Sequence, residues 1–160
     1  MSASFPLTRH EGSEAVVAYR CGHPVPVEEF LGDVAALAAL LPEREQVVNL
    51  CGDRYRFAVA LGAALSRRQV SLLPPSDTPG VLEDIASQFP GAYFLVDGAA
   101  PAVSAPILRY PEGHPLAGGA APMPRIAASQ TAAVLFTSGS TGQPKPYARS
   151  WGALVASARA

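Results

Sequence analysis

The sequence is poor in cysteine and in charged residues, and it has no long hydrophobic run. Its 160 residues include two cysteines, Cys21 and Cys51, and 16% of the residues are charged. Two isolated thiols in a chain of this length indicate a reducing compartment and no disulfide framework. The net charge is -1 without any basic run, so we expect no nucleic-acid partner. Apolar stretches such as residues 34–41 are much too short to cross a bilayer.

The N-terminus carries no recognisable targeting signal. Residues 1–10 have no positively charged segment followed by an apolar one, so we predict no signal peptide and expect a soluble cytoplasmic protein. Hydrophobic residues make up 49% of the chain, which is typical of a folded domain rather than a disordered one. The length is enough for one domain with its own core, and no internal repeat occurs.

Short apolar runs alternate with segments of helical periodicity. We expect a hairpin that turns at Cys21-Gly22-His23 and a short strand near Ile107-Leu108, within an irregular Ala/Pro/Gly-rich connection over residues 98–124. Such alternation, with strands that are apolar throughout, predicts an α/β fold with a largely parallel sheet and helices on both faces. The strands are predicted at 46–51, 70–73, 93–96 and 132–136, and the helices at 28–41, 54–68, 79–89 and 151–160, with caps at Asp53, Thr78 and Ser150.

A stretch rich in hydroxyl groups and glycine follows the predicted strand 132–136. Glycines let backbone N–H groups approach a ligand closely, hydroxyls donate hydrogen bonds, and successive N–H groups can form an anion-binding concavity. A lysine then adds a compact positive charge. These properties suit a polyphosphate. The stretch consists of Thr137, Ser138, Gly139, Ser140, Thr141 and Gly142, followed by Pro144 and Lys145.

This order differs from the P-loop of kinases and ATPases, which has Gly directly before the lysine and Ser or Thr directly after it. Here Pro144 precedes Lys145 and Pro146 follows it. Proline donates no N–H and disfavours helical geometry in the preceding residue, so the loop cannot run directly into a helix at Lys145. A flexible Ser/Gly linker is the simpler alternative. It would give no reason for an apolar strand before the loop or for Pro-Lys after it.

The stretch resembles the phosphate-binding signature of the adenylate-forming enzymes, which include acyl- and aryl-CoA synthetases and the adenylation domains of peptide synthetases. The resemblance implies that a carboxylate attacks the α-phosphate of ATP, that Mg²⁺ bridges phosphate oxygens, and that coenzyme A or a carrier-protein pantetheine accepts the acyl group. It also implies that Gly139 and Gly142 permit the turn. By the same resemblance, the groups that donate to phosphate oxygens are Thr137, Ser138, Ser140, Thr141 and Lys145, with Lys145 as the catalytic residue.

Two departures from the family pattern are apparent. The family commonly has a glycine just before the strand at 70–73, where this chain has Arg68-Gln69. The family also places Gly after Pro-Lys and a His five residues beyond it, where this chain has Pro146 and Trp151. That His lies near the acyl site in the family, so its absence leaves the carboxylate specificity open. The bulky Trp151 could wall the same pocket instead.

The rest of such an enzyme cannot be assigned in the sequence. An adenine-binding segment, a glutamate that binds Mg²⁺, an aspartate for the ribose and a mobile C-terminal domain with its catalytic lysine are missing. We therefore interpret residues 1–160 as part of the N-terminal domain, inactive alone and prone to self-association through exposed apolar surfaces. The alternatives are a non-catalytic nucleotide- or phosphate-binding module and a truncated remnant. A phosphotransferase is disfavoured by the order Pro144-Lys145-Pro146.

Other reactive side chains have simpler interpretations. A metal would need more ligands than Cys21 and His23, so these residues are better explained as a turn. We interpret Cys51 as a buried thiol and His114 as a solvated loop residue. Arg149 is either a phosphate ligand or a surface charge. Glu28 and Glu29 are expected in the first turn of a helix, where they favour its dipole.

Overall fold

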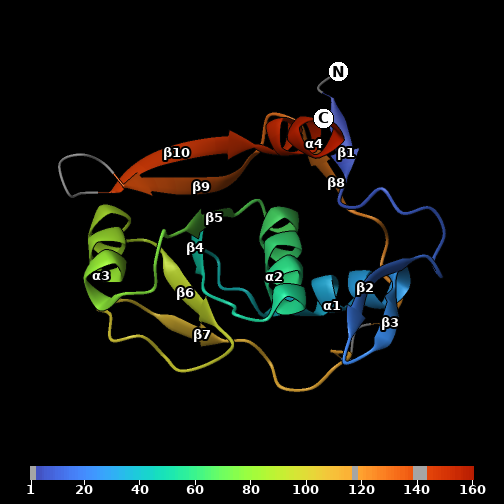
Figure 1. Cartoon of the computed structure of the whole chain (residues 1–160), viewed down its shortest axis with the longest axis horizontal. Coiled ribbons are helices and arrows are strands. Elements are labelled where there is room, and N and C mark those ends of the chain that lie inside the picture. Colours follow the sequence, from blue (N-terminus) through green and yellow to red (C-terminus); the bar gives the residue numbers. More distant parts are fainter. Residues whose placement is uncertain (1–2, 117–118, 139–143) are drawn as a thin grey trace.

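Six strands form one sheet in the order β10-β9-β5-β4-β6-β7 (Figure 1). The computed structural model describes residues 3–116, 119–138 and 144–160. All neighbours in the sheet are parallel except β9 and β10, which are antiparallel, so the predicted largely parallel sheet is confirmed. The strands are β4 (Gln46–Asn49), β5 (Val70–Leu73), β6 (Tyr93–Val96), β7 (Ile107–Arg109), β9 (Thr131–Ser138) and β10 (Pro144–Ser150).

Helices cover both faces of this sheet, as the apolar strands predicted. On one face, Val47 and Leu95 pack in a cluster with α1 and α2; on the other, Val48 and Phe94 pack against α3. Neighbouring residues of a strand point to opposite faces, so strands buried on both faces must be apolar throughout. The helices are α1 (Val27–Leu40), α2 (Arg54–Ser66), α3 (Pro79–Gln88) and α4 (Trp151–Arg159).

Two of the three predicted caps form their hydrogen bonds. The Asp53 carboxylate accepts a hydrogen bond from the N–H of Arg56 at 2.8 Å, and the Ser150 hydroxyl accepts one from the N–H of Ala153 at 3.2 Å. Thr78 occupies the N-cap position of α3, but its hydroxyl lies 3.0 Å from that of Ser76 instead of capping the helix. The starts of α2 and α4 are therefore fixed by short-range chemistry that the sequence already contains.

The predicted hairpin turn is also present. Strands β2 (Val16–Arg20) and β3 (His23–Pro26) are antiparallel, and Cys21 and Gly22 connect them. Both connecting residues have positive φ, 49° and 81°, which matches the twist of a two-residue hairpin. Within the described residues, no helix is long and apolar enough to cross a membrane.

Three strands were not predicted. Strands β1 (Ser4–Pro6) and β8 (Arg125–Ala127) form a separate two-stranded sheet. No local sequence pattern predicts a pairing between segments so far apart in the chain. The third is β10, which contains Pro144 and Pro146. Proline is tolerated at the edge of a sheet, and β10 lies at that edge. The expectation that no helix begins at Lys145 is confirmed.

The helix predicted at 54–68 ends two residues earlier, so Arg67 and Arg68 lie just beyond the last turn of α2 rather than within it. The helix ends at Ser66, Arg67 is its C-cap, and Arg68 has a left-handed φ of 59°. The N–H groups of Arg68 and Gln69 donate to the carbonyls of Leu65 and Ala64, which closes the helix in the way a glycine usually permits. Arg68 therefore adopts the conformation for which glycine is the favoured residue.

This geometry predicts that Arg68→Gly stabilises the protein. Relief of the left-handed conformation gains about 1–2 kcal/mol, whereas glycine adds about 0.5–1 kcal/mol of entropy cost. We expect the free energy of unfolding to rise by about 0.5–1 kcal/mol, measured by urea denaturation. Arg67→Gly is the matched control because φ of Arg67 is -89°, and it should lower stability. Equal losses in both variants would contradict the explanation.

Candidate functional site

The hydroxyl- and glycine-rich signature lies where β9 meets β10. Ser138 is the last residue of β9, Pro144 is the first of β10, and their Cα positions pair across the hairpin. Thr137 pairs with Lys145 one step further from the turn. Thr137 and Ser138 thus belong to the strand rather than to the loop that the sequence suggested. Gly139, Ser140, Thr141 and Gly142 lie outside the described residues.

The pairing puts Thr137 and Lys145 on the same face of the hairpin. Directly opposed residues of an antiparallel pair have Cβ atoms about 5 Å apart on one face. Both side chains are exposed, so a hydroxyl and an ammonium group face solvent together. Arg149 is exposed and belongs to the same face, since residues two apart along a strand share a face. This face therefore offers a hydroxyl and two cations to an anion.

The hairpin follows the edge of the sheet at which ligands usually bind in α/β folds. Strand β9 is parallel to β5, so Ser138 lies at the carboxyl end of the parallel strands. Ligands of open α/β sheets bind at this edge. No group of three or more His, Cys, Asp or Glu side chains that could hold a metal occurs within residues 3–116, 119–138 and 144–160. The described part of the hairpin presents donors that suit an anion, Thr137 and Lys145.

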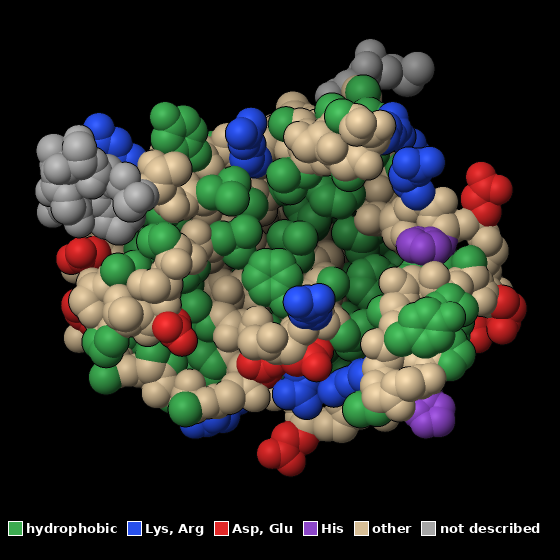
Figure 2. Space-filling model, in the orientation of Figure 1, with side chains coloured by type: hydrophobic (Ala, Val, Ile, Leu, Met, Phe, Trp, Pro, Cys, Tyr) green, Lys and Arg blue, Asp and Glu red, His purple; other side chains and the backbone are tan. Residues whose placement is uncertain are grey.

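Trp151 begins α4 at the far end of β10 from Lys145, roughly 20 Å along the strand. Its side chain packs against a cluster that contains Leu65 and Ile126. It also lines an apolar hollow of about 310 Å³ together with Phe5. Figure 2 shows hydrophobic side chains gathered on this face between α4 and α2. Trp151 thus walls a pocket, and its proposed role in choosing the carboxylate stays a prediction.

A buried polar cluster joins α1, α2 and the connection after β7, and sequence reasoning missed it. Asp33 on α1 is 1% exposed. Its carboxylate accepts hydrogen bonds from the Tyr55 hydroxyl at 2.8 Å and from the Leu116 N–H at 2.6 Å. Burial, together with the hydrogen bond to Asp33, raises the pKa of Tyr55, so the phenol remains a donor at neutral pH. A lone Asp within an apolar helix pattern is the signal that could have been read.

His114 belongs to the same cluster, and its interpretation as a solvated loop residue was wrong. Its Nε2 lies 2.9 Å from Oε1 of Glu29, and its Nδ1 lies 3.3 Å from Oδ2 of Asp33. The imidazole also meets the Tyr55 ring edge-to-face, with the ring centroids 5.1 Å apart. Glu29 therefore does more than favour the helix dipole: with Asp33 it ties the chain before Leu116 to α1.

Asp33→Ala should lower the free energy of unfolding by about 3 kcal/mol, because it leaves the Leu116 N–H and the Tyr55 hydroxyl buried without their acceptor. Tyr55→Phe should cost about 1–2 kcal/mol. Glu28→Ala is the matched control on the same helix, since Glu28 is exposed and should change stability by less than about 0.5 kcal/mol. Chemical denaturation measures all three. A loss from Asp33→Ala as small as that of the control would exclude a structural role for the cluster.

The two cysteines have opposite environments. Cys51 follows β4 and is 8% exposed, and burial raises its pKa to about 12, with the nearby Asp97 carboxylate adding to the effect. Cys21 is exposed in the β2–β3 turn. The interpretation of Cys51 as a buried thiol is therefore confirmed.

Iodoacetamide should modify Cys21 rapidly in the native protein and Cys51 only after unfolding. Mass spectrometry at neutral pH, with and without urea, measures both reactions. In a Cys21→Ser variant the native protein should take up almost no label. Rapid native labelling of that variant would mean that the Cys51 thiol is accessible and ionised.

Similar folds occur in several solved structures of other proteins. The N-terminal subdomain of NpsA from Klebsiella oxytoca, in complex with 3-hydroxybenzoyl-AMSN, superposes with a TM-score of 0.65 and 17% identity over 86% of this chain and 37% of that one. A malonyl-CoA ligase with methylmalonyl-CoA and AMP bound gives a TM-score of 0.73 and 19% identity. The match covers 95% of this chain and 33% of that one. NpsA-ThdA from Klebsiella oxytoca, an artificially fused adenylation–PCP di-domain, gives a TM-score of 0.57 and 21% identity. The match covers 79% of this chain and 28% of that one.

These likenesses establish the fold. The chain has the α/β fold of the N-terminal subdomain of adenylate-forming enzymes, and it spans about a third of the length of the chains it superposes on. No family model matches the sequence, and no curated protein matches it.

Proposed function

We propose that this chain, whose fold is that of the N-terminal subdomain of adenylate-forming enzymes, supplies the pyrophosphate-binding part of an ATP-dependent carboxylate-activating ligase. The observation that carries the proposal is the pairing of Thr137 with Lys145 on one exposed face of the β9–β10 hairpin. Strand β9, which carries Thr137, is parallel to β5, so the hairpin lies at the carboxyl edge of the parallel strands, where ligands of open α/β sheets bind.

The chemistry follows from the charges of the ligand. When a carboxylate attacks the α-phosphate of ATP, negative charge builds up on the departing pyrophosphate. The Lys145 ammonium and the Thr137 hydroxyl would hold its oxygens and offset that charge, which is how positioning and electrostatics accelerate such reactions. Mg²⁺, held by the phosphate oxygens, would neutralise further charge. Ser138, Gly139, Ser140, Thr141 and Gly142 are proposed to complete the phosphate site.

The remaining assignments extend the same proposal. The acyl-adenylate would pass to coenzyme A or to a carrier-protein thiol, since the similar folds include a CoA ligase and an adenylation–PCP fusion. The chain alone is proposed to bind phosphate without completing the reaction, and to self-associate. A cytoplasmic location also stays a prediction. A non-catalytic phosphate-binding module is the second candidate, because the pairing of Thr137 with Lys145 accounts for phosphate binding without any chemical step.

Lys145 is the only lysine of the chain, which makes a direct test simple. Protein made with isotope-labelled lysine gives one lysine side-chain signal in NMR. Titration with magnesium pyrophosphate should move this signal saturably. Thr137→Val should weaken the binding about 2–10-fold, because one hydrogen bond is lost.

Thr131→Val is the matched control, since Thr131 begins the same strand at its other end, and it should bind like the unchanged protein. An unmoved lysine signal at millimolar pyrophosphate would rule out the proposed site. ATP–pyrophosphate exchange separates the two candidates: exchange by the chain alone would indicate a self-sufficient enzyme, and binding without exchange is the expected result.

A further inference from the structure

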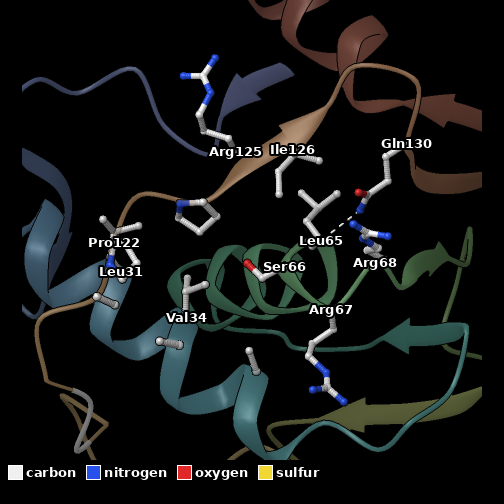
Figure 3. Close-up of a pocket in the computed structure, with 14 residues that line it drawn as sticks. Leu31, Val34, Leu65, Ser66, Arg67, Arg68, Pro122, Arg125, Ile126 and Gln130 are labelled. Atoms are coloured by element: carbon white, nitrogen blue, oxygen red, sulfur yellow. Dashed lines mark hydrogen bonds between the residues drawn. The ribbon is translucent and has the colours of Figure 1, made fainter. Parts of the chain in front are cut away.

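A hollow of about 490 Å³ lies on the opposite side of the fold from the signature hairpin. Figure 3 shows that its residues come from α1, from the end of α2 and from the segment between Pro122 and Gln130. Helix α2 leads from the carboxyl end of β4 to the amino end of β5, so Arg67 and Arg68 lie at the amino edge of the sheet. Strand β9 begins at Thr131, at this same amino edge, and extends about 23 Å to Ser138 at the carboxyl edge. The hollow is thus separate from the proposed phosphate site.

One part of the wall of the hollow is apolar and firmly packed. Leu31, Val34, Leu65 and Ile126 line it, and each is at most 5% exposed. Side chains packed this closely hold their positions. The volume is within the range of small-molecule sites, which combine apolar walls with a few polar groups. An apolar body of several carbon atoms fits such a space.

The charged residues that line the hollow are all arginines. Arg67, Arg68 and Arg125 line it, and none of its lining residues is acidic. Figure 3 shows Arg68 beside Gln130, whereas Arg67 and Arg125 extend outward on opposite sides. Arg67 is 3.5 Å from a carboxylate oxygen of Glu43, which is itself almost fully exposed. Arg125 donates to the Ser4 carbonyl at 2.8 Å. The rim is therefore cationic.

Arg68 is the least expected member of this rim. Its backbone is left-handed, a conformation that glycine would adopt without strain. Strained residues of this kind tend to persist at binding sites. The side chain that imposes the strain is a cation exposed at the mouth of the hollow. Helix closure does not require it, because backbone N–H groups already satisfy the last carbonyls of α2.

We propose that this hollow binds a small amphiphilic anion, with its apolar chain against Leu31, Val34 and Ile126 and its anionic headgroup at Arg68. A guanidinium binds carboxylate or phosphate oxygens through parallel N–H groups, so the headgroup is one of these two. The site goes beyond the proposed function, because it shares no residue with the signature hairpin.

The test is a calorimetric titration of the chain with four probes below their micelle concentrations. Decanoate and decyl phosphate represent the two headgroups, decanol lacks the charge, and acetate lacks the chain. We expect saturable binding of at least one anionic ten-carbon probe, at least 10-fold weaker binding of decanol, and none of acetate. The tighter of the two anions identifies the headgroup. Equal affinity for decanol, or no saturable binding of either anion, would overturn the proposal.

Variants separate binding from stability. Arg68→Gly should lower the affinity for the anionic probe at least 5-fold while the urea concentration at the midpoint of unfolding rises. A purely structural arginine would not give this combination. Ala35→Leu fills the hollow from an exposed position of α1 and should also weaken binding. Arg54→Ala, at the exposed start of α2, is the charge control and should bind normally. Undiminished binding in Arg68→Gly would remove Arg68 from the site, and the proposal with it.

Discussion

The position of β9 between two partners is the constraint on which the signature depends. Parallel pairing with β5 fixes β9 within the sheet and directs Ser138 to the carboxyl edge. Antiparallel pairing with β10 returns the chain at once and places Lys145 opposite Thr137. A βα loop, as in a P-loop, would instead carry the lysine into a helix. The two prolines that flank Lys145 prevent that path, so the same residues that distinguish the sequence also determine the shape of the site.

The polar cluster around Asp33 has a different role from the signature. Through the Asp33 carboxylate it joins α1, α2 and the irregular connection after β7. Such a buried group is tolerated only because its oxygens are hydrogen-bonded. The connection lacks regular structure around His114, so these bonds replace the ladder hydrogen bonds that a strand would supply. The cluster thus stabilises the fold on the side of the sheet that carries α1 and α2.

Features encoded by short-range patterns were predictable, whereas those that depend on distant contacts were not. The parallel strands, the turn at Cys21-Gly22 and the caps Asp53 and Ser150 follow from residues a few positions apart. The pairing of β1 with β8 and the contact of His114 with Asp33 join segments that only the folded chain brings together. Strand β10 was missed because its prolines suggested a loop, although an edge strand tolerates them. At the candidate site, the phosphate-binding role of these groups stays a prediction from the sequence, and the structure supplied the face that Thr137 and Lys145 share.

The prolines of β10 have one further effect, on how molecules of this protein can meet. An edge strand normally offers a row of N–H and C=O groups to which another chain can add. Two of the seven residues of β10, Pro144 and Pro146, have no N–H to offer. A neighbouring strand docked there would lose those bonds, so the sheet resists growth into a continuous intermolecular ribbon at this margin.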